Sequence, residues 1–133
     1  MSPLEVVVRD TLTVNGGPCT IVSLSGRAAV EDGAWFRRLL EVQAVGGPTR
    51  MVVDLSRLSS MDWWAALMLM WVARVVRRRG GMLVLAAPLP TVATLLESAG
   101  APQVMPVFGT VRSAASNWSD SLSLRPPTSA IRD

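Results

Sequence analysis

The chain opens with two runs of apolar and β-branched residues that have the length of strands. Residues 4–9 and 20–24 form these runs, and Asn15-Gly16-Gly17-Pro18 lies between them. Asparagine, glycine and proline in this order are typical of a turn, so the segment predicts two strands joined by a hairpin-like connection.

Three further short apolar runs follow. Residues 51–55 and 82–86 are too short for helices and have the composition of buried strands. Residues 104–108 form a last short run that Pro106 interrupts. Because proline cannot donate to a strand ladder, this last strand is expected at a sheet edge.

The intervening segments show helical spacing of apolar residues. Asp62 is a suitable N-cap for the longest helix, and Gly80-Gly81 supply the glycine that helix ends favour. The helices are expected, in chain order, over residues 31–45, from Asp62 to Arg79, between Pro90 and the terminator Gly100, and over residues 110–118.

Alternating strands and helices of these lengths predict an α/β fold with a mostly parallel or mixed sheet, the opening hairpin adding an antiparallel edge. We expect about five strands and about four helices in one domain over residues 1–118. Residues 119–133 are rich in Ser, Pro and Thr and lack periodicity. They predict a flexible C-terminal tail.

The amino-acid composition limits the kinds of functional site that the chain can form. The chain has no histidine and one cysteine, Cys19, which disfavours metal sites, cofactor sites and most acid-base catalysis, so we expect no enzyme. Cys19 is expected to be an inert small apolar residue. The 13 basic residues, all arginine, face 10 acidic ones for a net charge of +3. The arginines at 74 and 77–79 are better explained as a solvated helix end than as a nucleic-acid site.

The predicted location is the cytoplasm. The N-terminal residues lack a basic region followed by an apolar core, so no secretory signal is apparent. The longest apolar run, from Trp63 to Ala73, has 11 residues. A span of about 20 is needed to cross a bilayer, so no membrane insertion is expected.

Several short motifs, taken together with the order of elements, resemble the STAS family over residues 4 to about 118. They are Ser25-Gly26, Val53-Asp54-Leu55-Ser56, Met61-Asp62, Arg79-Gly80-Gly81-Met82-Leu83-Val84-Leu85 and Leu95-Leu96-Glu97-Ser98-Ala99-Gly100. The resemblance implies the fold of bacterial anti-sigma-factor antagonists. In typical antagonists the aspartate that opens the long helix precedes Ser-Ser/Thr-Gly, and a hydroxyl there is phosphorylated by a partner anti-sigma factor with kinase activity.

This chain departs from that pattern at the switch itself. Asp62 is followed by Trp63 and Trp64, and indole has no hydroxyl to accept a phosphoryl group. The family's Gly-Glu-Leu-Asp after the second strand reads Gly26-Arg27-Ala28-Ala29, which alters the usual partner-facing rim. Ser59 and Ser60, expected in the loop before the helix, are weaker alternative acceptors.

The two aspartates of these motifs have simpler roles than a catalytic pair. Asp62 is expected to cap the long helix. Asp54, expected at the end of a buried strand, should accept backbone hydrogen bonds from a neighbouring loop.

The charges of the long helix fix its orientation, because its arginines must mostly face water. Residues three or four positions apart lie on the same face of a helix. Counted back from Arg78, these positions form an apolar stripe that faces outward, and Val75 is expected to point in nearly the same direction. The expected partner-binding residues are Trp63, Trp64, Leu67, Trp71, Arg74 and Arg78. The opposite, core-facing set is Ala65, Ala66, Leu69, Val72, Ala73 and Val76. Alternatively, another part of the chain, such as the C-terminal tail, covers the tryptophans.

These features predict a non-catalytic regulatory module that binds an anti-sigma factor or another STAS-containing protein and is insensitive to the usual phosphorylation. Self-association as a homodimer through the stripe is a variant of this hypothesis. Two alternatives are a structural subunit of a transport or other assembly and a small-ligand sensor.

Overall fold

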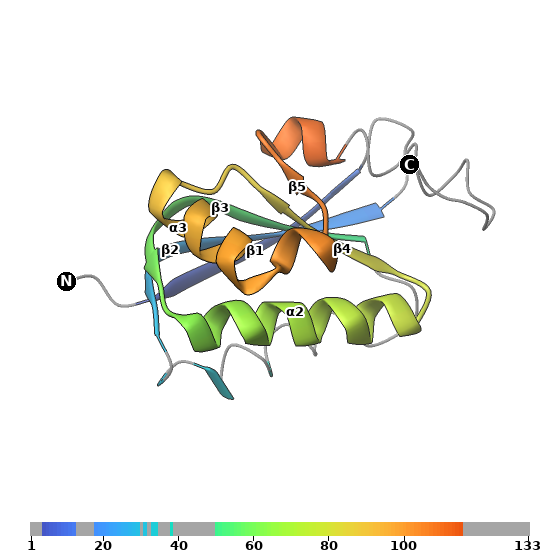
Figure 1. Cartoon of the computed structure of the whole chain (residues 1–133). Helices are drawn as coiled ribbons and strands as arrows, with labels where there is room; N and C mark the ends of the chain where they lie inside the picture. Colours follow the sequence, from blue (N-terminus) through green and yellow to red (C-terminus); the bar gives the residue numbers. More distant parts are fainter. Residues whose placement is uncertain are drawn as a thin grey trace.

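The computed structural model describes residues 4–12, 18–29, 31, 33–34, 38 and 50–115. Its centre is a five-stranded sheet in the order β1-β2-β3-β4-β5 (Figure 1). The strands are β1 (Glu5–Leu12), β2 (Pro18–Ala28), β3 (Arg50–Met61), β4 (Met82–Ala86) and β5 (Val107–Phe108). β1 runs antiparallel to β2, and the other neighbours are parallel. The predicted α/β class and antiparallel edge are thus confirmed.

Two strands are longer than their apolar runs. β2 and β3 remain paired from Thr20 and Met51 to Ala28 and Met61, with irregularities after Ser23 and Gly26. The last strand is shorter than predicted, because the N–H groups of Val104 and Met105 donate to the Ala101 carbonyl, in and after the 3₁₀ turn Ala101–Gln103, and not to a strand. Pro106 lies just before β5, where its carbonyl accepts a hydrogen bond from the Leu85 N–H at 2.9 Å.

The long helix α2 (Trp63–Arg78) has the ends that its sequence predicts. After the C-cap Arg79, the Gly80 N–H donates to the Arg77 carbonyl and the Gly81 N–H to the Val76 carbonyl, both at 3.0 Å. Gly80 has a φ of 86°, a left-handed conformation that glycine adopts without a Cβ clash. Together these features form the Schellman motif that closes many helices.

The remaining helical segments are short. α3 (Pro90–Ala99) ends at Gly100, as predicted. Residues 111–115 form the described part of the last expected helix. Of the helix expected over residues 31–45, only Gly33, Ala34 and Arg38 are described as helical; the rest of that prediction, and the tail predicted at 119–133, lie outside the described residues.

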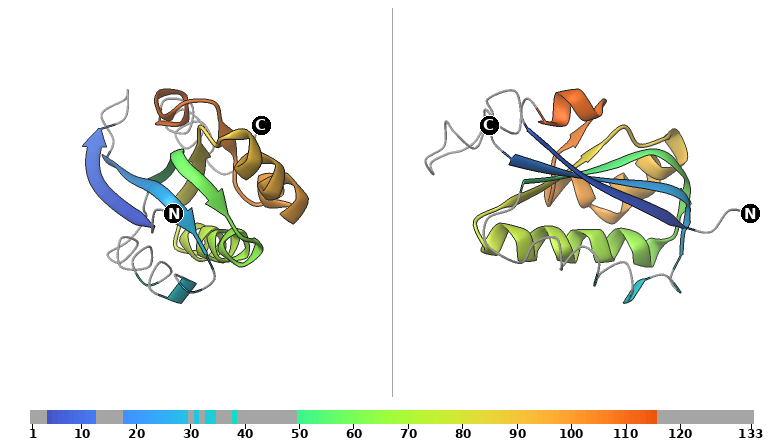
Figure 2. Two further views of the ribbon diagram at one scale, coloured as in Figure 1. Left: turned by 90° about the vertical axis from the view of Figure 1, so that its left-hand side faces the viewer. Right: turned by 180° about the vertical axis from the view of Figure 1, so that it is seen from behind.

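Alternating side chains on the strands build two cores. One face of the sheet carries Val22, Val53 and Leu85, which pack with buried residues of α2 and α3. The other carries Cys19, Ile21 and Val52 and is covered at one end by the helical turn at Ala114. Figure 2 shows α2 and α3 together on one side and the turn at 111–115 on the other. We call the latter the far face, because α2 and α3 lie on the opposite side of the sheet.

Cys19 belongs to the smaller core. Burial raises the pKa of its thiol to about 11, although the charge of Arg50 acts in the opposite direction. A thiolate is therefore strongly disfavoured near neutral pH. This environment agrees with the inert role expected from the sequence.

Candidate functional site

The first turn of α2 lies where the carboxyl ends of β2 and β3 meet. The Asp62 N–H donates to the carbonyl of Ala28, the last residue of β2, at 2.9 Å. The Asp62 carboxylate accepts a hydrogen bond from the Ala65 N–H at 3.0 Å. The predicted cap is therefore present, and it fixes Trp63 and Trp64 as the first two residues of the helix.

We expect Asp62→Ala to lower the free energy of unfolding by about 1 kcal/mol, because the Ala65 N–H loses its acceptor. Asp62→Asn is the matched control, since its amide oxygen can still cap the helix. Chemical denaturation monitored by circular dichroism measures both. Equal losses in the two variants would mean that the carboxylate charge, not the cap, is what matters.

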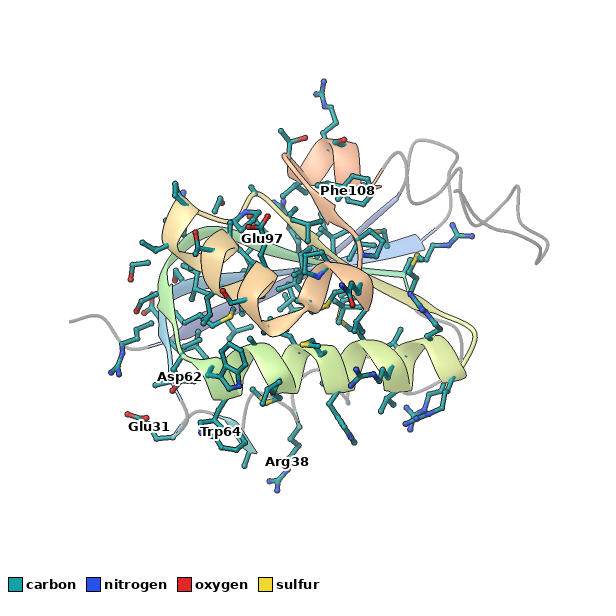
Figure 3. The ribbon with its side chains drawn as sticks, viewed as in Figure 1. Glu31, Arg38, Asp62, Trp64, Glu97 and Phe108 are labelled. Atoms are coloured by element: carbon teal, nitrogen blue, oxygen red, sulfur yellow. The ribbon has the colours of Figure 1, made fainter. Side chains whose placement is uncertain are left out.

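The three tryptophans of α2 are more exposed than is usual for large apolar side chains. The exposed fraction is 62% for Trp64, 45% for Trp63 and 37% for Trp71. In Figure 3, Trp64 extends from the first turn of α2 away from the sheet, on the same side of the molecule as Glu31 and Arg38. We call Trp63 and Trp64 the indole platform. Exposed apolar surface of this kind usually marks an interaction site.

The rest of the predicted stripe is less uniform. Arg74 and Arg78 are exposed, but Leu67 is half-buried. Val75, placed close to the outward direction from the sequence, is buried at 9% exposure. The predicted core-facing set is fully confirmed: Ala65, Ala66, Leu69, Val72, Ala73 and Val76 are all buried.

More residues of α2 are buried than a helical wheel predicts, because several elements contact the helix. β4, α3 and the 3₁₀ turn all do so. A Cβ on Gly33 would lie 4.0 Å from the Met68 sulfur, so the chain at Gly33 also approaches α2. The Arg77 guanidinium donates to the Val104 carbonyl at 3.1 Å, so this arginine is tied to the 3₁₀ turn. The exposed part of the stripe is thereby concentrated at the indole platform and around Trp71.

The sequence predicted that Ser59 and Ser60 lie in a loop, and this prediction is wrong. Both belong to β3, because pairing with β2 continues past the apolar run as far as Ala28 and Met61. The Ser59 hydroxyl donates to the Gly26 carbonyl at 2.7 Å. Phosphorylation of Ser59 would remove that donor.

The altered rim lies beside these serines. Arg27 pairs with Ser60 in the sheet and is half-buried. Ala28 and Ala29 are buried, at the positions following Arg27. The backbone of Arg27 therefore lies beside the end of β3, just before α2, while the two alanines belong to the packed interior.

Asp54 also differs from its predicted setting. It lies within β3 and not at its end. Its carboxylate accepts from the backbone N–H of Ser56 at 3.0 Å and from the Ser23 hydroxyl at 3.4 Å. The backbone donor is thus two residues along the same strand, where β3 is irregular, and not in a neighbouring loop.

The far face of the sheet carries a hollow that was not predicted from the sequence. It measures about 380 Å³ and is lined by Val7, Arg9, Ser23, Leu24, Ser25, Asp54, Ser56 and Arg57. These residues come from three strands, so only the pairing of β1, β2 and β3 brings them together. No sequence motif could have identified them.

Within the described ranges no group of three or more His, Cys, Asp or Glu side chains could hold a metal ion. No helix in the same part of the chain is both long and apolar enough to cross a membrane. What the surface around α2 presents is apolar area flanked by arginines, which suits binding of another protein.

Comparison with known proteins supports one fold. The family model of the STAS domain matches residues 9–114. A search of curated proteins finds no match. An anti-sigma factor antagonist from Mycobacterium paratuberculosis has 17% identity and a TM-score of 0.73, with 84% of this chain and 91% of that chain covered.

Two further solved structures show the range of the fold. The anti-sigma factor antagonist SpoIIAA, a Bacillus protein, in its unphosphorylated form has 18% identity and a TM-score of 0.67, covering 86% of this chain and 97% of that chain. The murine anion transporter Slc26a9 has 16% identity and a TM-score of 0.65, covering 86% of this chain and 22% of that chain.

Proposed function

Because this chain belongs to the STAS domain family, we propose that it is a non-catalytic regulatory module that binds an anti-sigma factor or another STAS-containing protein. The binding surface is centred on the indole platform, Trp63 and Trp64, and extends to Trp71, Arg74 and Arg78 along α2. Leu67 lies between Trp64 and Trp71 on α2 and is half-buried, so it contributes at the margin of the binding surface. The partner-bound state is not switched by phosphorylation at the start of α2.

One observation carries this proposal: two exposed tryptophans occupy the first turn of α2, at the positions that resemble the phosphoacceptor site of the family's antagonists. In such antagonists a phosphate at a helix N-terminus is favoured by the helix dipole, and its charge then disrupts the partner surface. Tryptophan removes the acceptor oxygen. In its place it offers a large, rigid apolar side chain of the kind most enriched in binding hot spots.

The setting of the platform favours a protein partner. Asp62 fixes the first turn through two hydrogen bonds, one to Ala28 and one from Ala65. A fixed backbone lowers the entropy lost on binding, because fewer conformations are frozen out. Arginines along the same helix add guanidinium groups that can pair with carboxylates at the rim of an interface.

The test is the affinity for each kinase-like anti-sigma factor of the same genome, measured by calorimetry. Trp64→Ala should weaken binding by about 2 kcal/mol, or about 30-fold in Kd. Leu89→Ala is the matched control, because Leu89 is also an exposed apolar residue, 38% accessible, but precedes α3. Its Kd should stay within about twofold of wild type. Unchanged affinity in Trp64→Ala would contradict this placement of the interface.

A second experiment tests whether binding is insensitive to phosphorylation. Adding ATP to the wild-type complex should leave its Kd unchanged, because Trp63 and Trp64 have no hydroxyl. Mass spectrometry of the same sample checks Ser59 and Ser60. Phosphate on either serine together with loss of binding would contradict phosphorylation insensitivity while leaving the platform as the binding surface.

A second candidate function is supported by the structural neighbours that are STAS parts of transporters, among them Slc26a9 and a SulP transporter STAS domain from Vibrio cholerae. In that case the same chain would be a structural subunit of a transport assembly. Co-purification of the tagged protein with a membrane transporter, and not with an anti-sigma factor, would favour this alternative.

A further inference from the structure

β1 is an edge strand of the sheet. It is the first strand in the order β1-β2-β3-β4-β5, and among the residues that the structure describes it pairs only with β2. At the opposite edge, β5 has two residues and follows Pro106, so it offers almost no ladder. An eight-residue edge strand is a ready template for pairing with another strand.

A highly exposed residue in the first half of β1 is apolar. Val7 has an exposed fraction of 63%, the highest among the large exposed hydrophobic residues of the described chain. It lines the hollow on the far face together with Arg9. Val6 and Val8, which alternate with it, pack against the core on the helix side. Valine on both faces of an edge strand favours pairing along its open side.

The residues around Val7 are self-complementary. The sequence is Glu5-Val6-Val7-Val8-Arg9. When two copies of β1 lie antiparallel with Val7 opposite Val7, Glu5 of each copy lies opposite Arg9 of the other. On the other face, Val6 lies opposite Val8. Every cross-strand pair is then either apolar with apolar or acidic with basic.

The backbone allows the same register. In an edge strand, the N–H and C=O groups of alternate residues point toward the open side. Pairing centred on Val7 sets odd residues opposite odd ones and even residues opposite even ones. The outward-pointing groups of one copy therefore meet those of the other, and each ladder hydrogen bond is made twice by the two-fold symmetry.

We propose that β1 is a self-association edge, through which two copies of this chain join their sheets into one continuous sheet about a two-fold axis at Val7. The axis is perpendicular to the sheet, so the helix-covered faces of both copies lie on the same side. The indole platform lies on α2 and remains available to its own partner. This inference does not rest on the proposed function.

Protective charges alone do not account for the pattern. Charged residues at an edge discourage pairing with other strands, and any sign or spacing serves that purpose. Opposite charges at equal distances on either side of an exposed valine are what a two-fold antiparallel pair requires. Both Glu5 and Arg9 are exposed and alternate with Val6 and Val8, so they lie on the same face as Val7.

Charge reversal tests the register. Glu5→Arg sets arginine opposite Arg9, and Arg9→Glu sets glutamate opposite Glu5, in both cases twice per dimer. Sedimentation velocity over a concentration series should show that each single variant raises the dimer Kd at least about tenfold. The double variant Glu5→Arg with Arg9→Glu restores opposite charges and should return the Kd to within about threefold of wild type.

The two single variants change the net charge in opposite directions, so a weaker dimer in both excludes a general charge effect. Circular dichroism confirms that each variant is folded. Trp64→Glu is the control for the other surface and should leave the dimer Kd unchanged. Anti-sigma-factor binding, measured on the Glu5→Arg monomer, reports on the proposed function separately.

Three results would overturn the inference. One is a wild-type protein that stays monomeric at millimolar concentration. Another is a dimer whose Kd is unaffected by the single reversals or stays weak in the double variant. The third is a dimer that dissociates in Trp64→Glu but not in Glu5→Arg, which would show that the two copies associate through the indole platform.

Discussion

Leu69→Ala is expected to lower the free energy of unfolding by about 3 kcal/mol. Leu69 is fully buried on the face of α2 that packs against the sheet. Truncation removes apolar contacts and leaves a cavity that the surrounding strands, held by their hydrogen bonds, can fill only in part. Urea unfolding followed by circular dichroism measures the loss.

The matched control is Trp64→Ala on the same helix. Trp64 is 62% exposed, so its truncation should change the free energy of unfolding by less than about 1 kcal/mol, although it removes a larger side chain. A loss as large as that of Leu69→Ala would show that the indole is packed within the chain. That result would remove the basis of the indole platform.

Val53→Asp is expected to prevent folding under native conditions. Val53 is fully buried in β3, which lies between β2 and β4 at the centre of the sheet, and it faces α2 and α3. A carboxylate there would lose its hydration without gaining a partner, a cost of several kcal/mol that is comparable to the whole stability of a small domain. Circular dichroism and the soluble fraction after expression report the outcome.

The next residue along the strand supplies the control. Asp54 points to the other face, where its carboxylate accepts from the Ser56 N–H. Asp54→Asn keeps an oxygen that can accept this bond, so the variant should fold and lose less than about 1 kcal/mol. If Val53→Asp folds with near-native stability, the assignment of the two faces of β3 is wrong.

Much of α2 follows from the sequence alone. Its start at Asp62, its end before Gly80-Gly81 and its core-facing residues all agree with the structure. Capping and helical periodicity depend on residues within a few positions of one another, so they can be read locally. The same holds for β4 and for the end of α3 at Gly100.

The exposure of the tryptophans was also predictable in part. The arginines of α2 fix its outward direction, and Trp63, Trp64 and Trp71 are indeed exposed. The burial of Val75 was not predictable in this way. It depends on which elements flank the helix, and a helical wheel contains no information about neighbours.

Tertiary structure alone decided the rest. β3 continues through Ser59 and Ser60 because β2 supplies hydrogen-bond partners beyond the apolar run, and the Asp54 carboxylate bonds where that pairing is irregular. The hollow at Arg9 and Arg57 and the open edge at Val7 exist only because β1, β2 and β3 are neighbours. Sequence by itself determined the elements, their caps and their apolar faces, since these are local properties; strand order and pairing join residues far apart in the chain, and they decided which of those faces remain exposed.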